Sequence, residues 1–573
     1  MNSVLSPRMV LVGEFGYAGY DVDYEPEPVS QIGQFGFTKG AEFAGSPSEE
    51  ELTTKLFTGP YPTLFNDKPQ NSYEMPITFT YIPADPHLGG HHQFTFGTDD
   101  YWQSAGSRLT HDNASGDYLL IFNNGKPDEI TVYNFPIPTS ISDMTNQAFY
   151  ATDTWTIKQV ALDLGVRWER YHAYNPAQRK PNGQFADLFP AETFPAQDLL
   201  TWTDVVPRIG AAWNVGGKGK TVIKGFFGMF RDTPGNVFGN AYNSNAQVSR
   251  TYAWSGPCAP TAPLAPVEYQ CDATQSFLQS LPSLTPISES GGKSQVLNTH
   301  LKQDYIDEYD ASVEREIGPN MGVTASYIFH GVYDNYPVDA NGVDIGHNYS
   351  VPVQFTDVLT GAPITLYTYA AKTGQTENEQ LNTPSSRPDT YNTLMFSFAK
   401  RTSAKWSAAA SFWDTKYHRW INGTANLYGD PNTWFFPIDT TWNWGFNANA
   451  YYNLPRGFAL SAFETAESGT PGQRTEVFSS SALSQKSETV NMGPYGQYRG
   501  PAISNLSLKA AKIFNIGERY HVEGNVQVFN VLNSSAAVST NYLTTTNPSK
   551  PTFGVISDLI SPRVLRLGAK FSF

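Results

Sequence analysis

The sequence predicts an all-β chain that crosses a membrane as an antiparallel β-barrel, and three observations lead to that prediction. Aromatic residues make up 14% of the chain and charged residues only 16%, while the mean hydropathy is −0.38. Long segments alternate apolar and polar residues, and short turns and long loops join these segments in succession. A membrane β-barrel has these properties because its apolar band occupies every second residue, so that the averaged hydropathy stays low.

The composition also excludes several other classes of protein. No run approaches the ~18 consecutive apolar residues that indicate a membrane-spanning helix. The net charge of −15 argues against a nucleic-acid partner, which needs basic patches. The segment from Met1 to Arg8 has no basic region followed by an apolar core, so no secretory signal is visible. An outer-membrane location would therefore imply that the start of the protein is missing from this sequence.

The last nine residues show the alternation most clearly. Leu565, Leu567, Ala569, Phe571 and Phe573 fall on one face of the expected strand, with Arg566, Gly568, Lys570 and Ser572 on the other. Such a strand separates two different solvents.

Earlier segments repeat this pattern in pairs. Residues 160–168 place a wholly apolar stripe opposite a polar face, and residues 208–215 repeat it before the turn from Gly216 to Gly219. So short a turn predicts an antiparallel hairpin. Eight polar residues are expected to face the lumen of the barrel: Asp163, Arg167, Glu169, Arg208, Glu308, Asp310, Arg566 and Lys570.

About 16 to 18 strands can be recognised in this way. The long connections, such as 232–299, 332–388 and 468–500, are rich in Pro, Gly, Ser and Asn. We expect the long loops at the extracellular end of the barrel and the short turns at the periplasmic end.

Cys258 and Cys271 are the two cysteines, and they lie thirteen positions apart in a Pro-rich stretch. A disulfide is the favoured interpretation, and two free thiols or half of a metal site remain as alternatives. A disulfide would favour an oxidising compartment.

No group of residues indicates catalysis, a metal or a cofactor. His91 and His92 are adjacent, so on a strand their side chains point to opposite faces and do not share a metal. Asp304, Glu308 and Asp310 fit a polar pore lining better than a cation site. The segment from Asp339 to Asp344 fits a solvated turn better than a calcium loop, because the downstream Glu is missing. We therefore expect no enzymatic activity.

Several segments resemble TonB-dependent outer-membrane receptors, and their combination is most similar to the Oar-like branch. Those segments are residues 147–155 (QAFYATDTW), 162–169 (LDLGVRWE), 206–210, 224–230, 467–471, 529–533 and the terminal strand. The resemblance covers residues 146–573 well. Residues 1–145 resemble early barrel strands and long loops only weakly, with 92–97 as the best match.

The resemblance implies a barrel of about 22 strands that encloses a plug. It implies that Gly568, Phe571 and Phe573 form the signal read by the barrel-assembly machinery. It also implies a plug domain, a TonB box and a signal peptide, all of which are absent from this sequence. The inner-membrane TonB-type motor could then act only through the missing plug.

The expected function is energy-coupled uptake of a bulky nutrient, such as a carbohydrate or a siderophore-like compound, in the outer membrane of a Gram-negative bacterium. The chain would be a fragment of a longer receptor, in contact with outer-membrane lipid and with an unknown extracellular ligand. Two alternatives remain: a surface adhesion or matrix-interaction barrel that transports nothing, and a secreted soluble β-rich binding module. The soluble module predicts apolar faces that are buried inward.

Overall fold

The structure is a computed structural model of the 573-residue chain. It describes residues 1–24, 48–54, 56–58, 66–84, 86, 89–109, 116–259, 271–292, 296–336, 343–344, 348–369, 378–403, 405–421, 430–517, 519–544 and 553–573. Residues 339–342, part of the segment weighed above as a calcium loop, lie outside these ranges.

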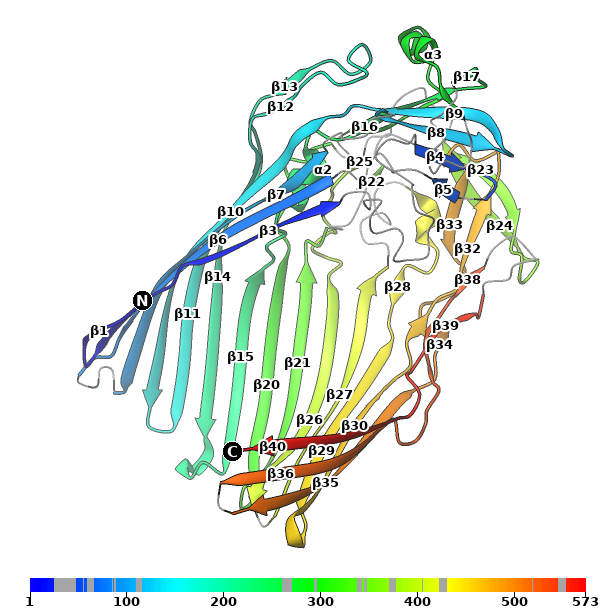
Figure 1. Ribbon diagram of the computed structural model, residues 1–573. Coiled ribbons are helices and arrows are strands. Elements are labelled where there is room, and N and C mark those ends of the chain that lie inside the picture. The colour runs from blue at the N-terminus through cyan, green and yellow to red at the C-terminus, as the bar shows by residue number, and fades with distance from the viewer. Residues whose placement is uncertain are drawn as a thin grey trace.

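One curled antiparallel sheet of 19 strands forms the wall of the molecule (Figure 1). Neighbours in sequence are mostly neighbours in the sheet, as expected for a series of hairpins. The strands are β1(Asn2–Ser6), β2(Met9–Gly13), β3(Gly16–Tyr24), β6(Asn66–Tyr81), β7(His91–Leu109), β10(Ile137–Ile157), β11(Val160–Asn175), β14(Gln197–Asn214), β15(Thr221–Arg231), β20(Tyr305–Gly318), β21(Met321–Tyr333), β26(Asp389–Ser403), β27(Trp406–Trp420), β28(Ile438–Asp439), β29(Trp442–Asn453), β30(Phe458–Glu467), β35(Ile503–Ile516), β36(Tyr520–Phe529) and β40(Val564–Ser572).

The strand number slightly exceeds the sequence estimate because the sheet includes short pieces. β28 has only two residues, and β2 and β3 lie end to end along the same neighbour, β6. Residues 1–145, which resemble early barrel strands only weakly in sequence, contain β6 and β7, two long strands paired over most of their length. β10 runs through residue 146, where the sequence analysis placed a boundary, and the sheet continues on both sides.

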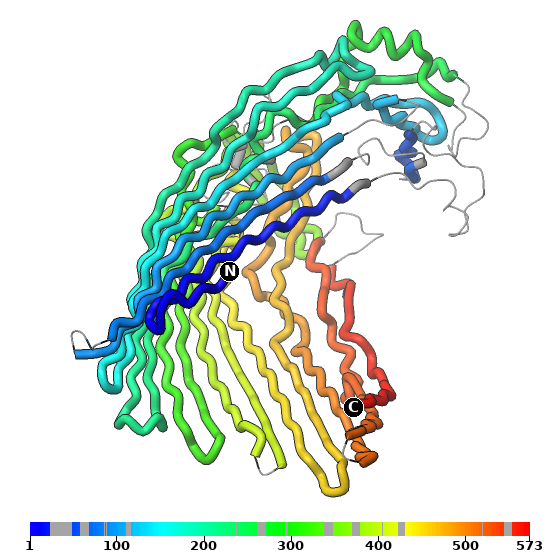
Figure 2. Tube along the Cα trace, turned by 60° about the vertical axis from the view of Figure 1, so that its left-hand side comes forward, coloured from blue at the N-terminus to red at the C-terminus, as the bar shows by residue number. Residues whose placement is uncertain are grey.

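The two margins of the sheet are formed by the first and last strands. The tube in Figure 2 shows the N-terminal strands, in blue, along one margin and the C-terminal strands, in orange and red, along the other. Within the described ranges, no ladder joins β40 to β1, β2 or β3. In the described part of the chain, the sheet is therefore a curled wall whose first and last strands are not paired with each other.

Short turns close the hairpins at one end of the wall. Between β14 and β15 the chain turns over η4(Val215–Gly217), and Gly216, Gly217 and Gly219 all have positive φ, between 67° and 73°. Glycine populates this region without a steric penalty, which explains the sequence Gly-Gly-Lys-Gly there. A similar short turn, η7(Pro455–Gly457), joins β29 and β30.

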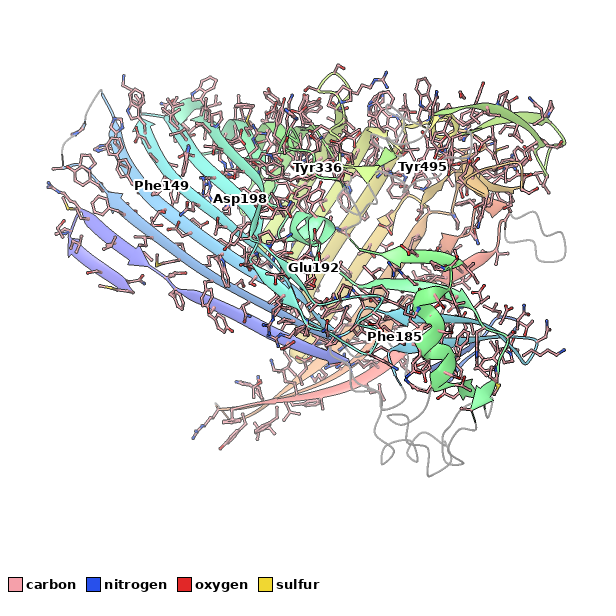
Figure 3. The ribbon with its side chains drawn as sticks, turned by 90° about the horizontal axis from the view of Figure 1, so that it is seen from above. Phe149, Phe185, Glu192, Asp198, Tyr336 and Tyr495 are labelled. Atoms are coloured by element: carbon pink, nitrogen blue, oxygen red, sulfur yellow. A yellow bond between two sulfur atoms is a disulfide. The ribbon has the colours of Figure 1, made fainter. Side chains whose placement is uncertain are left out.

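The long connections gather at the other end into what we call the loop layer. Its largest unit is a six-stranded sheet of β4(Ser48–Glu51), β5(Leu56–Thr58), β8(Tyr118–Asn123), β9(Lys126–Tyr133), β16(Val248–Ala253) and β19(Ser288–Gly291). Phe122, Ile130 and Trp254 are among its fully buried residues. Seen from above, Phe185 lies beside α3(Gln275–Ser280) in this layer (Figure 3).

Smaller elements complete the loop layer. They are β12(Gln178–Lys180), β13(Glu192–Phe194), α2(Val237–Tyr242), β17(Cys258–Ala259), β18(Asp272–Ala273), η5(Leu281–Ser283), β22(Val343–Asp344), β23(Tyr349–Thr356), β24(Pro363–Tyr369), β25(Asn378–Glu379), η6(Pro431–Trp434), β31(Pro471–Gly472), β32(Thr475–Ser479), β33(Ser487–Asn491), β34(Tyr498–Arg499), β37(Ala537–Thr540), β38(Leu543–Thr544) and β39(Ile556–Leu559). Among the described residues, no helix has the length and hydropathy of a membrane span.

Candidate functional site on the polar face of the sheet

The register of the sheet determines which side chains share a face. Gly165 of β11 pairs with Arg208 of β14, which pairs with Gly228 of β15, and Glu308 and His330 continue the row. Partners in a ladder point to the same side of a sheet. Followed to β40, these rows place all eight residues that the sequence analysis assigned to the lumen on one face.

The opposite face carries a broad band of exposed apolar side chains. A fold that buried this face inward would cover these residues, yet each is at least 36% exposed. So large an exposed apolar surface marks contact with lipid or with a partner. Members of the band from successive strands are Phe149, Leu164, Val166, Ile209, Trp213, Ile223, Val313, Phe396, Phe412, Leu508, Val526 and Leu567.

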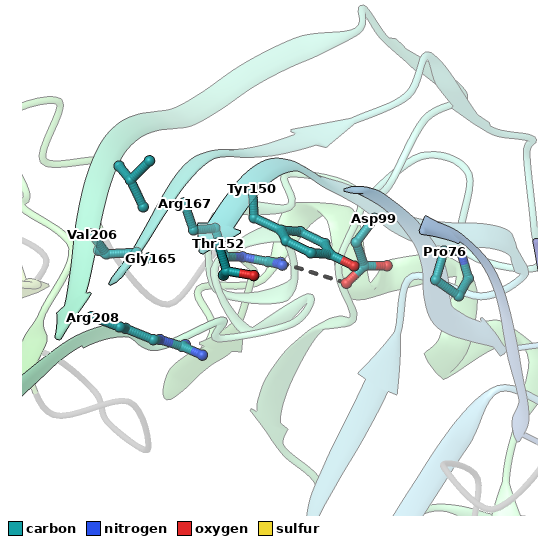
Figure 4. A pocket seen from close by; sticks show the side chains of 9 residues that line it. Pro76, Asp99, Tyr150, Thr152, Gly165, Arg167, Val206 and Arg208 are labelled. Atoms are coloured by element: carbon teal, nitrogen blue, oxygen red, sulfur yellow. Dashed lines mark hydrogen bonds and ion pairs between the residues drawn. The ribbon is translucent and has the colours of Figure 1, made fainter. Parts of the chain in front are cut away.

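A cavity of about 360 Å³ lies against the polar face of β10, β11 and β14 (Figure 4). It is lined by Pro76, Asp99, Tyr150, Thr152, Gly165, Val166, Arg167, Val206 and Arg208. The long β-strands fix these side chains because each occupies a set position in a continuous ladder.

The two arginines of the cavity have different surroundings. Arg167 donates to Asp99 at 3.5 Å and also to Glu169. The guanidinium of Arg208 lies over the ring of Phe230 at 4.5 Å, and Arg208 forms no ion pair with any carboxylate in the described part of the chain. Tyr150 and Thr78 share a hydrogen bond of 2.7 Å at the far side. A guanidinium without a carboxylate partner can bind an anionic group of a solute.

The remaining predicted polar residues lie elsewhere along the wall. Glu308 lies 3.4 Å from His330, and Asp310 is two residues further along β20. Asp163 accepts a hydrogen bond from Thr154 at 2.7 Å. On the last strands, Lys570 and Arg566 stand opposite Glu523 and Gln527, and Lys509 binds Glu523 at 2.6 Å. These residues lie on the same face of the sheet as the cavity, but they do not line it.

The terminal strand is paired along its whole length with β36. Gly568 stands opposite Asn525, and Phe571 opposite Val522. Phe571 and Phe573 are 57% and 84% exposed on the apolar face.

Cys258 and Cys271 form a disulfide with their Cα atoms 4.9 Å apart. The bond lies in the loop layer, where β17 pairs with β18.

His91 and His92 are the first two residues of β7, so they form a pair at the start of a strand. The ring of His92 stacks with those of Phe94 and Trp155, and its Nδ1 lies 2.8 Å from a carboxylate oxygen of Asp153. Within the described residues, no group of three or more His, Cys, Asp and Glu residues could hold a metal ion.

Sequence reasoning missed a buried ion cluster that joins two long connections. Arg474 donates to Asp357 at 3.0 Å and to Glu476 at 3.0 Å, and all three side chains are at most 7% exposed. Burial raises the pKa of Asp357, but the hydrogen bonds from Arg474 and Thr360 outweigh it and hold that pKa below its usual range. Burial and the charge of Asp357 raise the pKa of Glu476, despite a hydrogen bond from the Val358 amide.

Another carboxylate, that of Glu488, makes the stability of the loop layer depend on pH. Burial, followed by the charge of Asp430, raises the pKa of Glu488 to about 7 from 4.5. An acid with a raised folded-state pKa destabilises the fold as pH climbs from the unfolded value to the folded value. We expect resistance of the loop layer to proteolysis to fall between about pH 4.5 and 7 in the wild type. The fall should be smaller in Glu488→Gln, and equal pH profiles would contradict the assignment.

A family model described as "Outer membrane beta barrel domain" matches residues 1–464. No curated protein matches the chain. Among solved structures, the outer membrane transporter YddB from Escherichia coli is similar with a TM-score of 0.53 at 12% identity. The siderophore receptor PiuA from Acinetobacter baumannii is similar with a TM-score of 0.50 at 9% identity.

Both similarities extend over 100% of this chain, but over only 61% and 63% of the other two. At such low identity these similarities establish the fold alone. The chain thus spans about three fifths of the length of these structures.

Proposed function

Because the chain belongs to the outer-membrane β-barrel domain family, we propose that it forms most of the wall of an outer-membrane receptor that takes up a bulky nutrient. Its place is the outer membrane, and its fold is a transmembrane antiparallel β-barrel. The observation that carries the proposal is the separation of faces: an exposed apolar band on one side and all eight predicted polar residues on the other. The polar face would line the lumen.

The proposed role is that of the barrel portion of a longer receptor of the TonB-dependent type, in the Oar-like branch. Lipid cannot satisfy unpaired backbone groups, so the edges of β3 and β40, which have no partner strand among the described residues, would need one in the membrane. The 61% share of the YddB structure that the chain covers supports this proposal. A plug inside the lumen would connect the barrel to the inner-membrane motor, and the barrel-assembly machinery would read Gly568, Phe571 and Phe573.

The nutrient would be a carbohydrate or a siderophore-like compound captured by the loop layer. The cavity beside Arg208 then offers a guanidinium to an anionic group as the solute passes. The similar solved structures are those of a transporter and a receptor. We propose that this chain, too, has no enzymatic activity.

A second candidate is an adhesion barrel, favoured by the folded core of the loop layer. Thirteen buried residues, among them Leu120 and Leu281, give this layer a core of its own, as a binding surface requires. The third interpretation, a secreted soluble module, does not fit, because it needs the apolar face to be buried and that face is exposed.

Uptake measurements in cells separate the first two candidates. The labelled probes are iron-loaded siderophores and maltodextrins, and we expect deletion of the gene to abolish the accumulation of one of them. A protonophore should abolish accumulation of the same probe in the parent strain. Re-expression of the gene should restore uptake. Unchanged accumulation of every probe, combined with a loss of surface attachment, would instead establish the adhesion barrel.

A further inference from the structure

The short connections between the wall strands carry an unusual charge. We call these connections the short-turn rim: residues 7–8, 82–90, 158–159, 215–220, 319–320, 404–405, 454–457 and 517–519. Their basic residues are Arg8, Lys158, Lys218, Lys220, Lys405, Arg456 and Arg519. The same connections contain two acidic residues in the sequence, Asp85 and Glu518, which lie outside the described ranges.

This balance is the reverse of that in the whole chain. The protein has 38 basic and 53 acidic residues and a net charge of −15. All seven cations of the rim are exposed, and none forms an ion pair within the part of the chain that the structure describes. Among the described residues, these cations therefore have no carboxylate partner that neutralises them.

The backbone shows that these cations are present despite a local cost. Lys158, Lys405 and Arg456 have positive φ values of 53°, 75° and 63°. Gly or Asn suits such turn positions better, and the equivalent turn at Asn320, with φ 60°, has the expected residue. Three of the seven rim cations thus stand at turn positions that suit Gly or Asn better.

The position of the rim indicates its partner. Trp213, Tyr452, Phe514 and Phe571 are exposed on the apolar face close to these turns. Lys512 lies on that face, 4.3 Å from the ring of Phe458, and donates to the carbonyl of Arg456. The aliphatic stem of this lysine lies on an apolar surface while its ammonium group reaches the turn. This is the geometry of a side chain that snorkels to a membrane interface.

We propose that the short-turn rim binds the headgroups of anionic phospholipids in the leaflet that it faces. The cations occur on six of the eight short connections and do not gather in one patch, which suits a ring of lipids better than a compact protein partner. Basic residues near a membrane surface attract anionic lipid headgroups. The inference rests on the outer-membrane placement and not on the transported solute.

The proposal can be tested by competition between brominated lipids in vesicles that contain the full chain. Trp213 and Trp406 lie next to the rim, and a brominated lipid that contacts them quenches their fluorescence. We expect phosphatidylglycerol to be enriched over phosphatidylcholine around the wild type, on the order of fivefold. High salt should remove this preference, since exposed charges are screened. Equal quenching by the two lipids at low salt would overturn the proposal.

A rim variant and a matched control variant assign the effect to the rim. Replacing Lys158, Lys218, Lys220, Lys405 and Arg456 with Gln should remove most of the enrichment. Replacing five exposed cations of the loop layer with Gln should leave it intact: Lys126, Arg179, Lys302, Lys486 and Arg563. Equal loss in both variants would refute a role specific to the rim.

A triple glycine variant separates charge from folding. Lys158→Gly, Lys405→Gly and Arg456→Gly relieve the positive-φ strain while removing three charges. We expect this variant to fold at least as well as the wild type, by heat-modifiable migration on a gel, and to lose part of the enrichment. Full enrichment in this well-folded variant would count against the proposal.

Discussion

Replacing Arg474 with Met is expected to lower the local stability of the loop layer by about 3 to 5 kcal/mol. The long connections 334–388 and 468–502 should then separate at the ion cluster. The change leaves Asp357 and Glu476 buried without their shared cation. Two uncompensated carboxylates in a dry site repel each other and attract water. Hydrogen exchange of β23 and β32, and protease cleavage within these segments, should both accelerate.

A double variant tests whether charge, and not lost packing, causes the effect. Adding Glu476→Gln to Arg474→Met removes one of the stranded charges and should restore part of the protection. Asp357 should retain its own turn, since it also accepts hydrogen bonds from the amides of Leu359 and Thr360. Arg563→Met, an exposed arginine without an ion-pair partner among the described residues, is the control. Unaltered exchange in Arg474→Met would show that the cluster does not hold the layer together.

This cluster illustrates what the sequence could not predict. Arg474 and Asp357 lie 117 positions apart in irregular connections, and no periodicity or motif brings them together. The hairpins were predictable because alternation and a short turn are both local signals, as in β10 and β11 around Lys158.

The early strands and the cavity were harder to predict for different reasons. β6 contains Pro69 and Pro76, which remove ladder donors and make a segment look unlike a strand. Arg167 was identified as a polar face residue, but its partner Asp99 lies 68 positions away on β7. Only the register of β7, β10 and β11 places those two side chains and Tyr150 around one cavity.

Placing a lysine on the apolar face should destabilise the folded barrel far more than placing one on the polar face. Phe396 and Ser397 are adjacent on β26 and point to opposite sides. Phe396 is 53% exposed within the apolar band, and its ladder partner Phe412 extends that band. Phe396→Lys is expected to cost about 2 to 4 kcal/mol, because lysine in the middle of a bilayer must be desolvated or must distort the lipid.

The matched lysine at Ser397 would face water in the lumen, so Ser397→Lys should shift the unfolding midpoint in urea only slightly. Phe396→Ala measures the part of the loss that comes from removing the ring, which lies in the ladder between Ala325 and Phe412. Folding of all three variants into lipid vesicles can be compared by heat-modifiable migration. If Ser397→Lys were as damaging as Phe396→Lys, the two faces would meet the same solvent, and the assignment of the apolar band to lipid would be wrong.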